Sequence, residues 1–119
     1  MSVGLSVNID ERDDGVVVRI SGRLDATSAS VLENKLNELI EGGRMHLAID
    51  CIEIDYMSSA GMRLLLSVTK KLKVKGGKLH LCMVNEEVME IIRMAGFERI
   101  LSIFPTEQEA LLAFPQGDG

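Results

Sequence analysis

Hydrophobic and polar residues alternate near the start of the chain, with Leu5, Val7 and Ile9 as the apolar positions. The turn sequence Asp13-Asp14-Gly15 separates this stretch from the apolar run 16–20. Alternation with period two is typical of a strand with one buried face, and a short glycine turn between two such stretches is typical of a hairpin. The pattern therefore predicts an N-terminal β-hairpin.

The spacing then changes to that of an amphipathic helix, because apolar residues recur at intervals of three and four at Ala29, Leu32, Leu36, Leu39 and Ile40. Gly42-Gly43 ends this helix. Ser30 and Glu33 fit a capping box, but Asp25 or Thr27 would cap the helix equally well. Its start is therefore open by one turn.

The next segment, 45–54, is almost continuously apolar, which predicts a central strand buried on both faces of a partly parallel sheet. A second helix is predicted from Met62 to Val74, with a first half that is apolar nearly all round. Its last turns and the residue after them carry positive charge, which complements the negative end of the helix dipole, at Lys70, Lys71, Lys73 and Lys75.

The alternation of strand and helix continues to the end of the chain. Residues 79–84 form a predicted strand, and Asn85 caps a third helix that ends at Gly96, with an inward face of Val88, Ile91, Ile92 and Ala95. Residues 100–104 form a short fifth strand, and Thr106 with Glu109 forms a capping box for a last helix through Ala113. We therefore expect an α/β fold with a mixed sheet of four to five strands and about four helices.

Length and charge limit the classes of function. With 119 residues the chain is the size of a single domain, and we expect it to comprise residues 1–114 followed by a disordered tail, 115–119. The net charge of −5 and the scarcity of aromatic residues argue against nucleic-acid binding. No segment is apolar enough to insert into a membrane, and the N-terminus lacks the pattern of a signal peptide, so we expect a cytoplasmic protein.

Signatures of catalysis are mostly missing. We expect no metal and no cofactor, because the chain has no glycine-rich phosphate loop and no histidine pair at metal-binding spacing. The segment 57–61 resembles a nucleophile elbow, but Met57 stands where the elbow needs glycine, so we do not expect an enzyme. We interpret His46 and His80 as structural residues, and Cys51 and Cys82 as core thiols.

The serine pair Ser58 and Ser59 is the most informative feature, because it lies between the central strand and the second helix. Either serine would serve as an N-cap for the free N–H groups of the first helical turn. The same position also favours a phosphate, since those N–H groups and the positive end of the dipole attract a dianion. A cap and a phosphorylation switch are therefore both open.

The chain resembles the STAS domains of bacterial anti-sigma factor antagonists over nearly its whole length. The resemblance rests on five motifs in order, which are Gly22-Arg23-Leu24-Asp25, the segment 54–62 around the serine pair, Gly76-Gly77-Lys78-Leu79, Met94-Ala95-Gly96-Phe97 and the segment 106–111. Alignment of the family's motif glycine with Gly61 implies that Ser59 is the phosphoacceptor, with Ser58 as the alternative. This chain has Ser58 where the family commonly has Asp, and Ala60 where it has a second hydroxyl residue.

The resemblance implies a partner-switching mechanism. The unphosphorylated protein would bind an anti-sigma factor that is also a serine kinase and free its client, phosphorylation at Ser59 would release the complex, and a metal-dependent serine phosphatase would reset it. The partner-binding residues implied are Asp25, Ser58, Ser59, Ala60, Gly61 and Met62. The alternative is a structural STAS subunit of a transport ATPase complex, in which the serines only cap the helix and are not phosphorylated.

Overall fold

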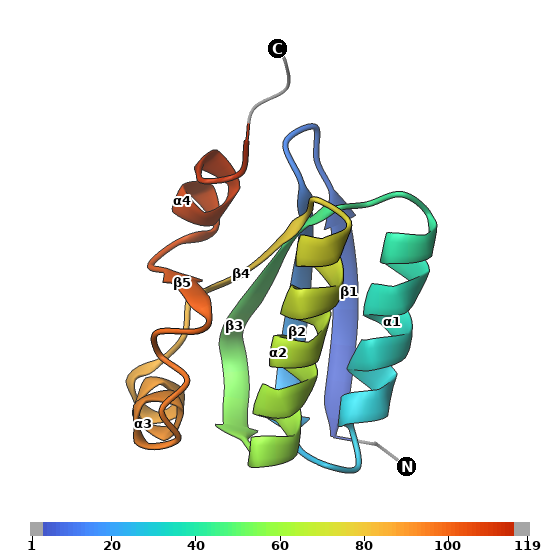
Figure 1. The fold of residues 1–119 in the computed structure, drawn as a ribbon. Helices are drawn as coiled ribbons and strands as arrows, with labels where there is room; N and C mark the ends of the chain where they lie inside the picture. Colours follow the sequence, from blue (N-terminus) through green and yellow to red (C-terminus); the bar gives the residue numbers. More distant parts are fainter. Residues whose placement is uncertain (1–3, 116–119) are drawn as a thin grey trace.

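The computed structural model describes residues 4–115 and shows a layered α/β arrangement (Figure 1). Its elements in chain order are β1 (Leu5–Glu11), β2 (Val16–Leu24), α1 (Ala29–Glu41), β3 (His46–Met57), α2 (Ser59–Val74), β4 (Lys78–Cys82), α3 (Glu86–Met94), β5 (Ser102–Phe104) and α4 (Glu107–Leu112). The predicted hairpin and α/β class are confirmed. Of the predicted tail, all but Pro115 lies outside the described residues.

The five strands of the described region form one mixed sheet in the order β1-β2-β3-β4-β5. β1 runs antiparallel to β2, and the other neighbouring pairs are parallel. β3 is therefore the central strand, as its apolar run predicts, with β2 on one side and β4 on the other. Because β2 and β3 are parallel, their carboxyl ends meet at the same edge of the sheet.

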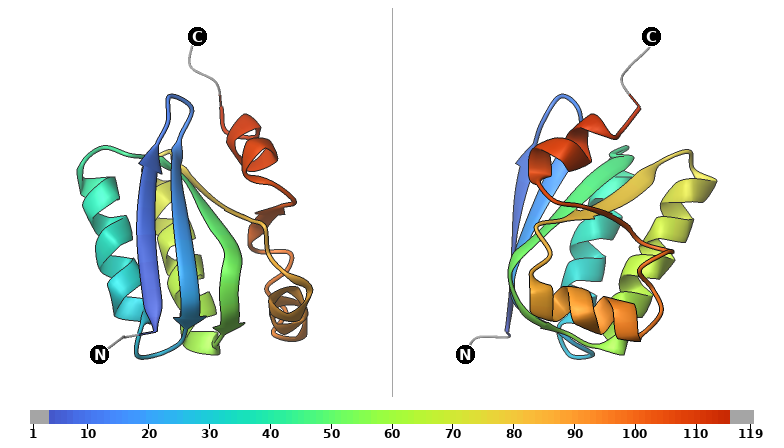
Figure 2. Two further views of the ribbon diagram at one scale, coloured as in Figure 1. Left: turned by 180° about the vertical axis from the view of Figure 1, so that it is seen from behind. Right: turned by 90° about the vertical axis from the view of Figure 1, so that its left-hand side faces the viewer.

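Two apolar clusters lie on opposite faces of this sheet. The larger one joins the strands to α1, α2 and α3, and includes Leu36, Ile49 and Leu65. The smaller one lies where α4 covers the other face, as Figure 2 shows, and comprises Val17, Ala48, Cys82, Ala110, Leu111 and Phe114. Since successive residues of a strand point to opposite faces, both faces of β3 are buried where α4 covers it.

Gly22 shows why the motif that ends β2 begins with glycine. Its φ of +110° is a conformation that other residues rarely adopt. A Cβ built at Gly22 would lie 1.9 Å from the carbonyl oxygen of Gly4, which also accepts a hydrogen bond from the backbone N–H of Arg23 at 2.6 Å. Only glycine allows this approach of the chain to the end of β2.

The structure fixes the start of the first helix, which the sequence left open by one turn, and moves the start of the second. The proposed Ser30–Glu33 box does not form, because α1 begins at Ala29 with Ser28 as N-cap, and Ser28 makes no side-chain capping bond. Instead Asp25 closes the preceding turn, where its Oδ1 accepts the backbone N–H groups of Thr27 and Ser28, each at 3.0 Å. The second helix begins at Ser59, three residues before the predicted Met62.

Smaller differences occur in the second half of the chain. β4 ends at Cys82 rather than at Val84, and Ala95 is exposed rather than part of the inward face of α3. Asn85 is confirmed as the cap of α3, since its side chain accepts the N–H of Val88 at 2.8 Å. The capping box of α4 is confirmed in part, because Thr106 accepts the N–H of Glu109 at 3.1 Å.

Candidate functional site

Ser58 is the N-cap of α2. Its backbone is extended, and its hydroxyl oxygen accepts the backbone N–H of Gly61 at 3.2 Å. Its own backbone N–H donates to the carbonyl of Leu24 at 2.9 Å, which fixes the start of α2 against the end of β2. The Ser58 hydroxyl is half-buried and engaged in this structural role.

Ser59 is the first residue of α2 and differs from its neighbour. Its side chain is exposed and makes no hydrogen bond to any other residue within 4–115. The hydroxyl therefore lies free at the positive end of a 16-residue helix, where a negatively charged group is stabilised. The geometry makes Ser59 the serine that is available for modification.

Gly61 and Met62 lie on the inner side of the same turn. A Cβ at Gly61 would lie 2.7 Å from Cγ of Leu24 and 2.9 Å from its carbonyl oxygen, and the side chain of Met62 is only 2% exposed. Both residues face the core and position α2, and the expectation that they contact a partner stays a prediction. Ala60, which is half-buried, remains within reach of a partner.

Asp25 lies at the same edge of the sheet, one residue after Leu24 and its bond to Ser58. Hydrogen bonds from Ser28, together with one from Thr27 and the nearby Arg23 guanidinium, hold the pKa of the Asp25 carboxyl below its ordinary value. Asp25 is therefore an anion at neutral pH. The structure thus places Asp25 and the serine pair at the same edge of the sheet, in agreement with the motifs that contain them.

The sequence interpretation missed one exposed pair beside this site. Arg23 and Tyr56 are register partners on β2 and β3, and the Arg23 guanidinium carbon lies 4.7 Å from the centroid of the Tyr56 ring. Tyr56 and Ile52 are both large apolar side chains that are more than one third exposed. Arg23 and Tyr56 each lie inside one of the motif segments, 22–25 and 54–62, which gave a signal, but side-chain exposure at the end of a strand depends on the fold.

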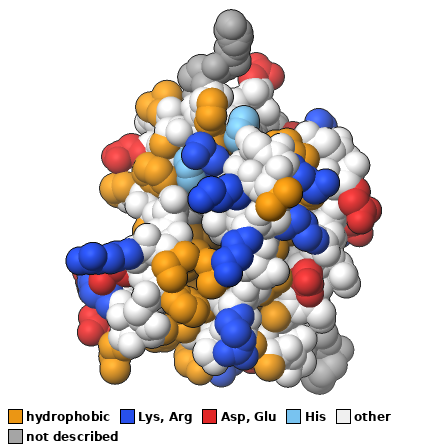
Figure 3. Space-filling model, viewed as in Figure 1, with side chains coloured by type: hydrophobic (Ala, Val, Ile, Leu, Met, Phe, Trp, Pro, Cys, Tyr) orange, Lys and Arg blue, Asp and Glu red, His pale blue; other side chains and the backbone are white. Residues whose placement is uncertain are grey.

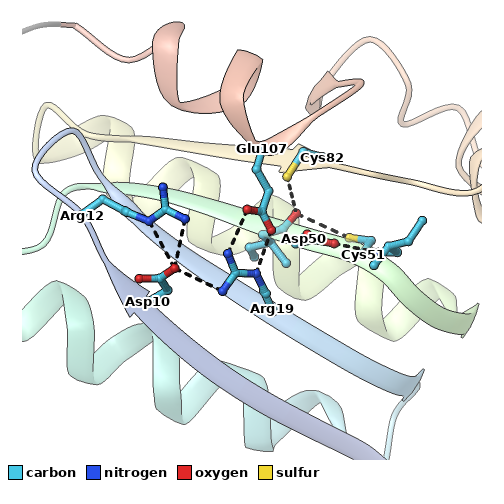
Figure 4. Close-up of polar contacts among 9 residues, drawn as sticks. Asp10, Arg12, Arg19, Asp50, Cys51, Cys82 and Glu107 are labelled. Carbon is cyan, nitrogen blue, oxygen red and sulfur yellow. Dashed lines mark hydrogen bonds and ion pairs between the residues drawn. The ribbon is translucent and has the colours of Figure 1, made fainter.

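A second polar cluster lies under α4, away from the serine pair (Figure 4). Arg19 of β2 donates two hydrogen bonds to the carboxylate of Glu107, at 2.8 and 2.9 Å, and a third to Asp10 at 3.2 Å. Asp10 also bonds Arg12 at 3.1 Å. This chain of charges ties the first residue of α4 to the β1–β2 hairpin.

Asp50, the register partner of Arg19 on β3, is buried beside this cluster with 5% of its surface exposed. Burial, and then contact with Glu107, raise the pKa of Asp50 to about 6. The Arg19 ion pair lowers the pKa of Glu107 instead. The pKa values of the two carboxyl groups therefore shift in opposite directions within one site, so Asp50 binds a proton at a higher pH than Glu107 does.

The two histidines are remote from the serine pair. His46 begins β3 while Ser58 follows its end, and a strand of 12 residues spans roughly 40 Å at about 3.3 Å per residue. His80 is buried, bonds the carbonyl of Ala110 through Nδ1 at 2.9 Å and stacks on Phe114 at 4.2 Å between ring centroids. Burial also lowers the pKa of His80. His80 therefore has the structural surroundings that the sequence predicts.

Within residues 4–115 no group of three or more His, Cys, Asp or Glu side chains has the arrangement of a metal site. In the same part of the chain, no helix has both the length and the apolar character needed to cross a bilayer. Cys51 and Cys82 are free thiols and both are buried, as predicted. The described region thus offers the surface around Ser59 as its main candidate for function.

Comparison with known proteins agrees with this geometry. The family model described as STAS domain matches residues 6–110. The anti-sigma-B factor antagonist of Bacillus subtilis is 30% identical over 101 residues, covering 85% of this chain and 92% of that protein. The residues that the family model matches include the serine pair and the first three helices.

Solved structures show the same fold. An anti-sigma factor antagonist from Mycobacterium paratuberculosis superposes with a TM-score of 0.84 at 22% identity, covering 95% of this chain and 96% of that one. The Bacillus cell fate determinant SpoIIAA in its phosphorylated form superposes with a TM-score of 0.67 at 20% identity, covering 89% of this chain and 96% of that one. Because the STAS domain model matches residues 6–110, the chain belongs to the STAS domain family.

Proposed function

We propose that this STAS domain is an anti-sigma factor antagonist that acts by partner switching, with Ser59 as its phosphoacceptor. The proposal rests on the different surroundings of the two serines, since Ser58 caps α2 while the Ser59 hydroxyl is exposed. A relative 30% identical is named an anti-sigma-B factor antagonist, and a structural neighbour is described in a phosphorylated form. Both descriptions fit a regulatory role.

The unmodified protein binds an anti-sigma factor through the surface formed by Asp25, Ser58, Ser59 and Ala60, and so frees the factor's client. The anti-sigma factor is itself the serine kinase. Phosphorylation places roughly −1.5 to −2 charges on Ser59, at the same edge of the sheet as the Asp25 carboxylate. Repulsion and desolvation then weaken the complex without a change of fold, since each tenfold loss of affinity requires only about 1.4 kcal/mol.

A metal-dependent serine phosphatase resets the switch. The domain itself is a binding module, since neither histidine lies beside Ser59 to act as the base of a serine hydrolase. Both histidines of the described region instead pack around Phe114, at the far end of β3.

Mass spectrometry of the protein from its native host, in growth and in stress, tests this proposal. We expect a phosphopeptide with the phosphate resolved to Ser59. Phosphate on Ser58 would contradict the assigned serine. Full coverage of the peptide without any phosphate would instead favour a structural STAS subunit of a transport ATPase complex.

Binding by variants provides the matched test. Ser59→Ala should retain binding to the anti-sigma factor, because no charge is added, whereas Ser59→Asp should weaken it. Ser30→Asp is the control, since Ser30 is also exposed and lies on the outside of α1. Equal binding by Ser59→Ala and Ser59→Asp would count against the switch.

A further inference from the structure

The chain separates its charges strongly. Residues 56–85 contain no Asp or Glu, although the chain has 18 of them. The same segment holds six of the 13 basic residues, all exposed, namely Arg63, Lys70, Lys71, Lys73, Lys75 and Lys78. The rest of the chain, with seven basic and 18 acidic residues, has a net charge of −11. The segment 56–85 is therefore a positively charged region of an otherwise acidic protein.

Three of these residues form a row on the outer side of α2, which we call the basic ridge (Arg63, Lys70 and Lys73). Their spacing of seven and three residues keeps them on one helical face, and Ser59 begins the same row four residues before Arg63. The opposite side of α2 is buried, with Met62, Leu65, Val68 and Leu72 in the core. Figure 3 shows Lys and Arg side chains following one another along the exposed side of α2.

The charges of the basic ridge are not neutralised by the protein. In the described part of the chain no acidic side chain forms an ion pair with Arg63, Lys70 or Lys73, although α1 beside them carries three Glu. Lys71 bonds only the neutral amide oxygen of Asn37, at 2.7 Å. Away from α2, by contrast, ion pairs engage Arg12, Arg19, Arg23, Arg44 and Arg93.

The helix dipole accounts for only part of this arrangement. Lys71 and Lys73 lie in the last turn, where positive charge is favourable. Arg63 lies in the second turn, near the positive end, where the dipole disfavours it. The first turn of α2 also has no acidic residue, whereas α3 and α4 each have two Glu there. Stability of the helix therefore does not explain the ridge.

We propose that the basic ridge of α2 docks on an acidic surface of the anti-sigma factor that binds at Ser59, an inference that rests on the proposed function. The ridge continues directly from the proposed contact at Ser59, so one partner surface reaches both. Phosphate on Ser59 lies one turn from Arg63, within reach of an i, i+4 pair. It therefore draws Arg63 away from the partner and lowers the positive potential along the ridge.

The occupant is an acidic patch on a protein rather than an anionic membrane. A membrane presents negative charge over a wide area, and the net charge of −11 on the rest of this chain opposes such an approach. The apolar side of α2 is also buried in the domain, so the helix cannot insert it into lipid. A local acidic patch matches one row of side chains.

Association kinetics test the inference with the anti-sigma factor captured by the tagged Ser59→Ala chain as the probe. At about 50 mM salt, Lys70→Glu should slow association by about threefold or more, and Lys70→Glu with Lys73→Glu by about tenfold. Arg99→Glu is the control, because Arg99 is exposed, lies between α3 and β5 and undergoes the same change of charge. Arg99→Glu should leave the association rate nearly unchanged. At about 0.5 M salt the difference in association rate between the Lys70→Glu variant and the wild type should become smaller.

The outcomes separate the two proposals. Capture of no anti-sigma factor would overturn the proposed function, and this inference with it. Capture followed by equal association rates for Lys70→Glu and Arg99→Glu would overturn the inference alone. Sedimentation with vesicles of phosphatidylcholine and phosphatidylglycerol gives a further check. Vesicle binding that Lys70→Glu abolishes, with unchanged association to the anti-sigma factor, would assign the ridge to membranes instead.

Discussion

The hydroxyl oxygen of Ser58 accepts the backbone N–H of Gly61 at 3.2 Å, while the hydroxyl of Ser59, one residue later, is exposed. Two adjacent serines thus have different surroundings, and the difference arises because α2 begins between them. Ser58 belongs to the structure of the helix start. Ser59 is available for chemistry at the same point.

This difference predicts unequal effects on stability. Ser58→Ala removes the cap of α2 and should lower the free energy of unfolding by about 0.5–2 kcal/mol. Ser59→Ala removes an exposed hydroxyl without a partner and should change the same quantity by less than about 0.5 kcal/mol. Urea denaturation of both variants measures this, and equal losses would contradict the assigned cap.

Gly61→Ala tests the close contact between α2 and β2. The new methyl group would lie 2.7 Å from Cγ of Leu24, so α2 must shift away from the end of β2. We expect a loss of about 1–3 kcal/mol in the free energy of unfolding. Ala60 offers a control at a half-buried position of the same turn, and Ala60→Ser should fold with nearly wild-type stability. A fully stable Gly61→Ala protein would show that the contact is not restrictive.

Asp50 predicts a distinct pH dependence. Its pKa is raised from 3.8 to about 6 because it is buried and faces Glu107. The folded state therefore binds this proton more tightly than the unfolded state does. The stabilisation that protonated Asp50 gives to the fold is complete below about pH 3.8 and is lost as pH rises through about 6. Asp50→Asn keeps a neutral side chain, and its oxygen can still accept the N–H of Ile52.

The free energy of unfolding of Asp50→Asn minus that of wild type should accordingly be larger at pH 7.5 than at pH 4. The variant thus gains stability relative to wild type as pH rises. Glu107 has the opposite dependence, because its lowered pKa gives stability that is present above the ordinary value and lost as pH falls. Glu107 titrates in both proteins, so the difference between them reports the Asp50 carboxyl together with its interaction with Glu107. A difference that is constant across this pH range would contradict the raised pKa.

The thiols should be unreactive in the folded protein. Burial raises the pKa of Cys82 to about 12 and that of Cys51 still further, so little thiolate forms at pH 8. We expect an aromatic disulfide reagent to modify neither thiol until denaturant is added, and then both. Rapid reaction of Cys82 alone in native buffer would indicate that α4 opens, because α4 covers that residue.

Much of the fold was predictable because the spacing of apolar residues along the chain indicates which face of each strand or helix is buried. The hairpin, the central strand and the caps at Asn85 and Thr106 all rest on local patterns, and the structure confirms them. The predicted N-cap at Ser58 or Ser59 is confirmed at Ser58, but the first turn of α2 lay outside the predicted range 62–74, because Ser59 to Gly61 carry no apolar periodicity. The start of α2 is fixed by the bond from Ser58 N–H to Leu24, a residue 34 positions earlier.

The candidate site was predictable in composition but not in orientation. The motif placed Asp25 and the serines together, but it did not show that Met62 points into the core. The cluster of Arg19, Asp50 and Glu107 escaped the sequence interpretation, because Arg19 and Glu107 are 88 residues apart. Its only signal was the presence of charged residues inside two largely apolar strand segments, with Arg19 in 16–20 and both Asp50 and Glu53 in 45–54.

The affinity of the anti-sigma factor for unmodified protein and for protein carrying phosphoserine at position 59 tests the central claim most directly. Phosphoserine placed at exposed Ser102 of β5 is the control for added charge. We predict that phosphate at Ser59 weakens the complex by about 100-fold, equivalent to about 2.7 kcal/mol, while phosphate at Ser102 has little effect. Equal affinity of the unmodified and Ser59-phosphorylated proteins would contradict partner switching by this domain.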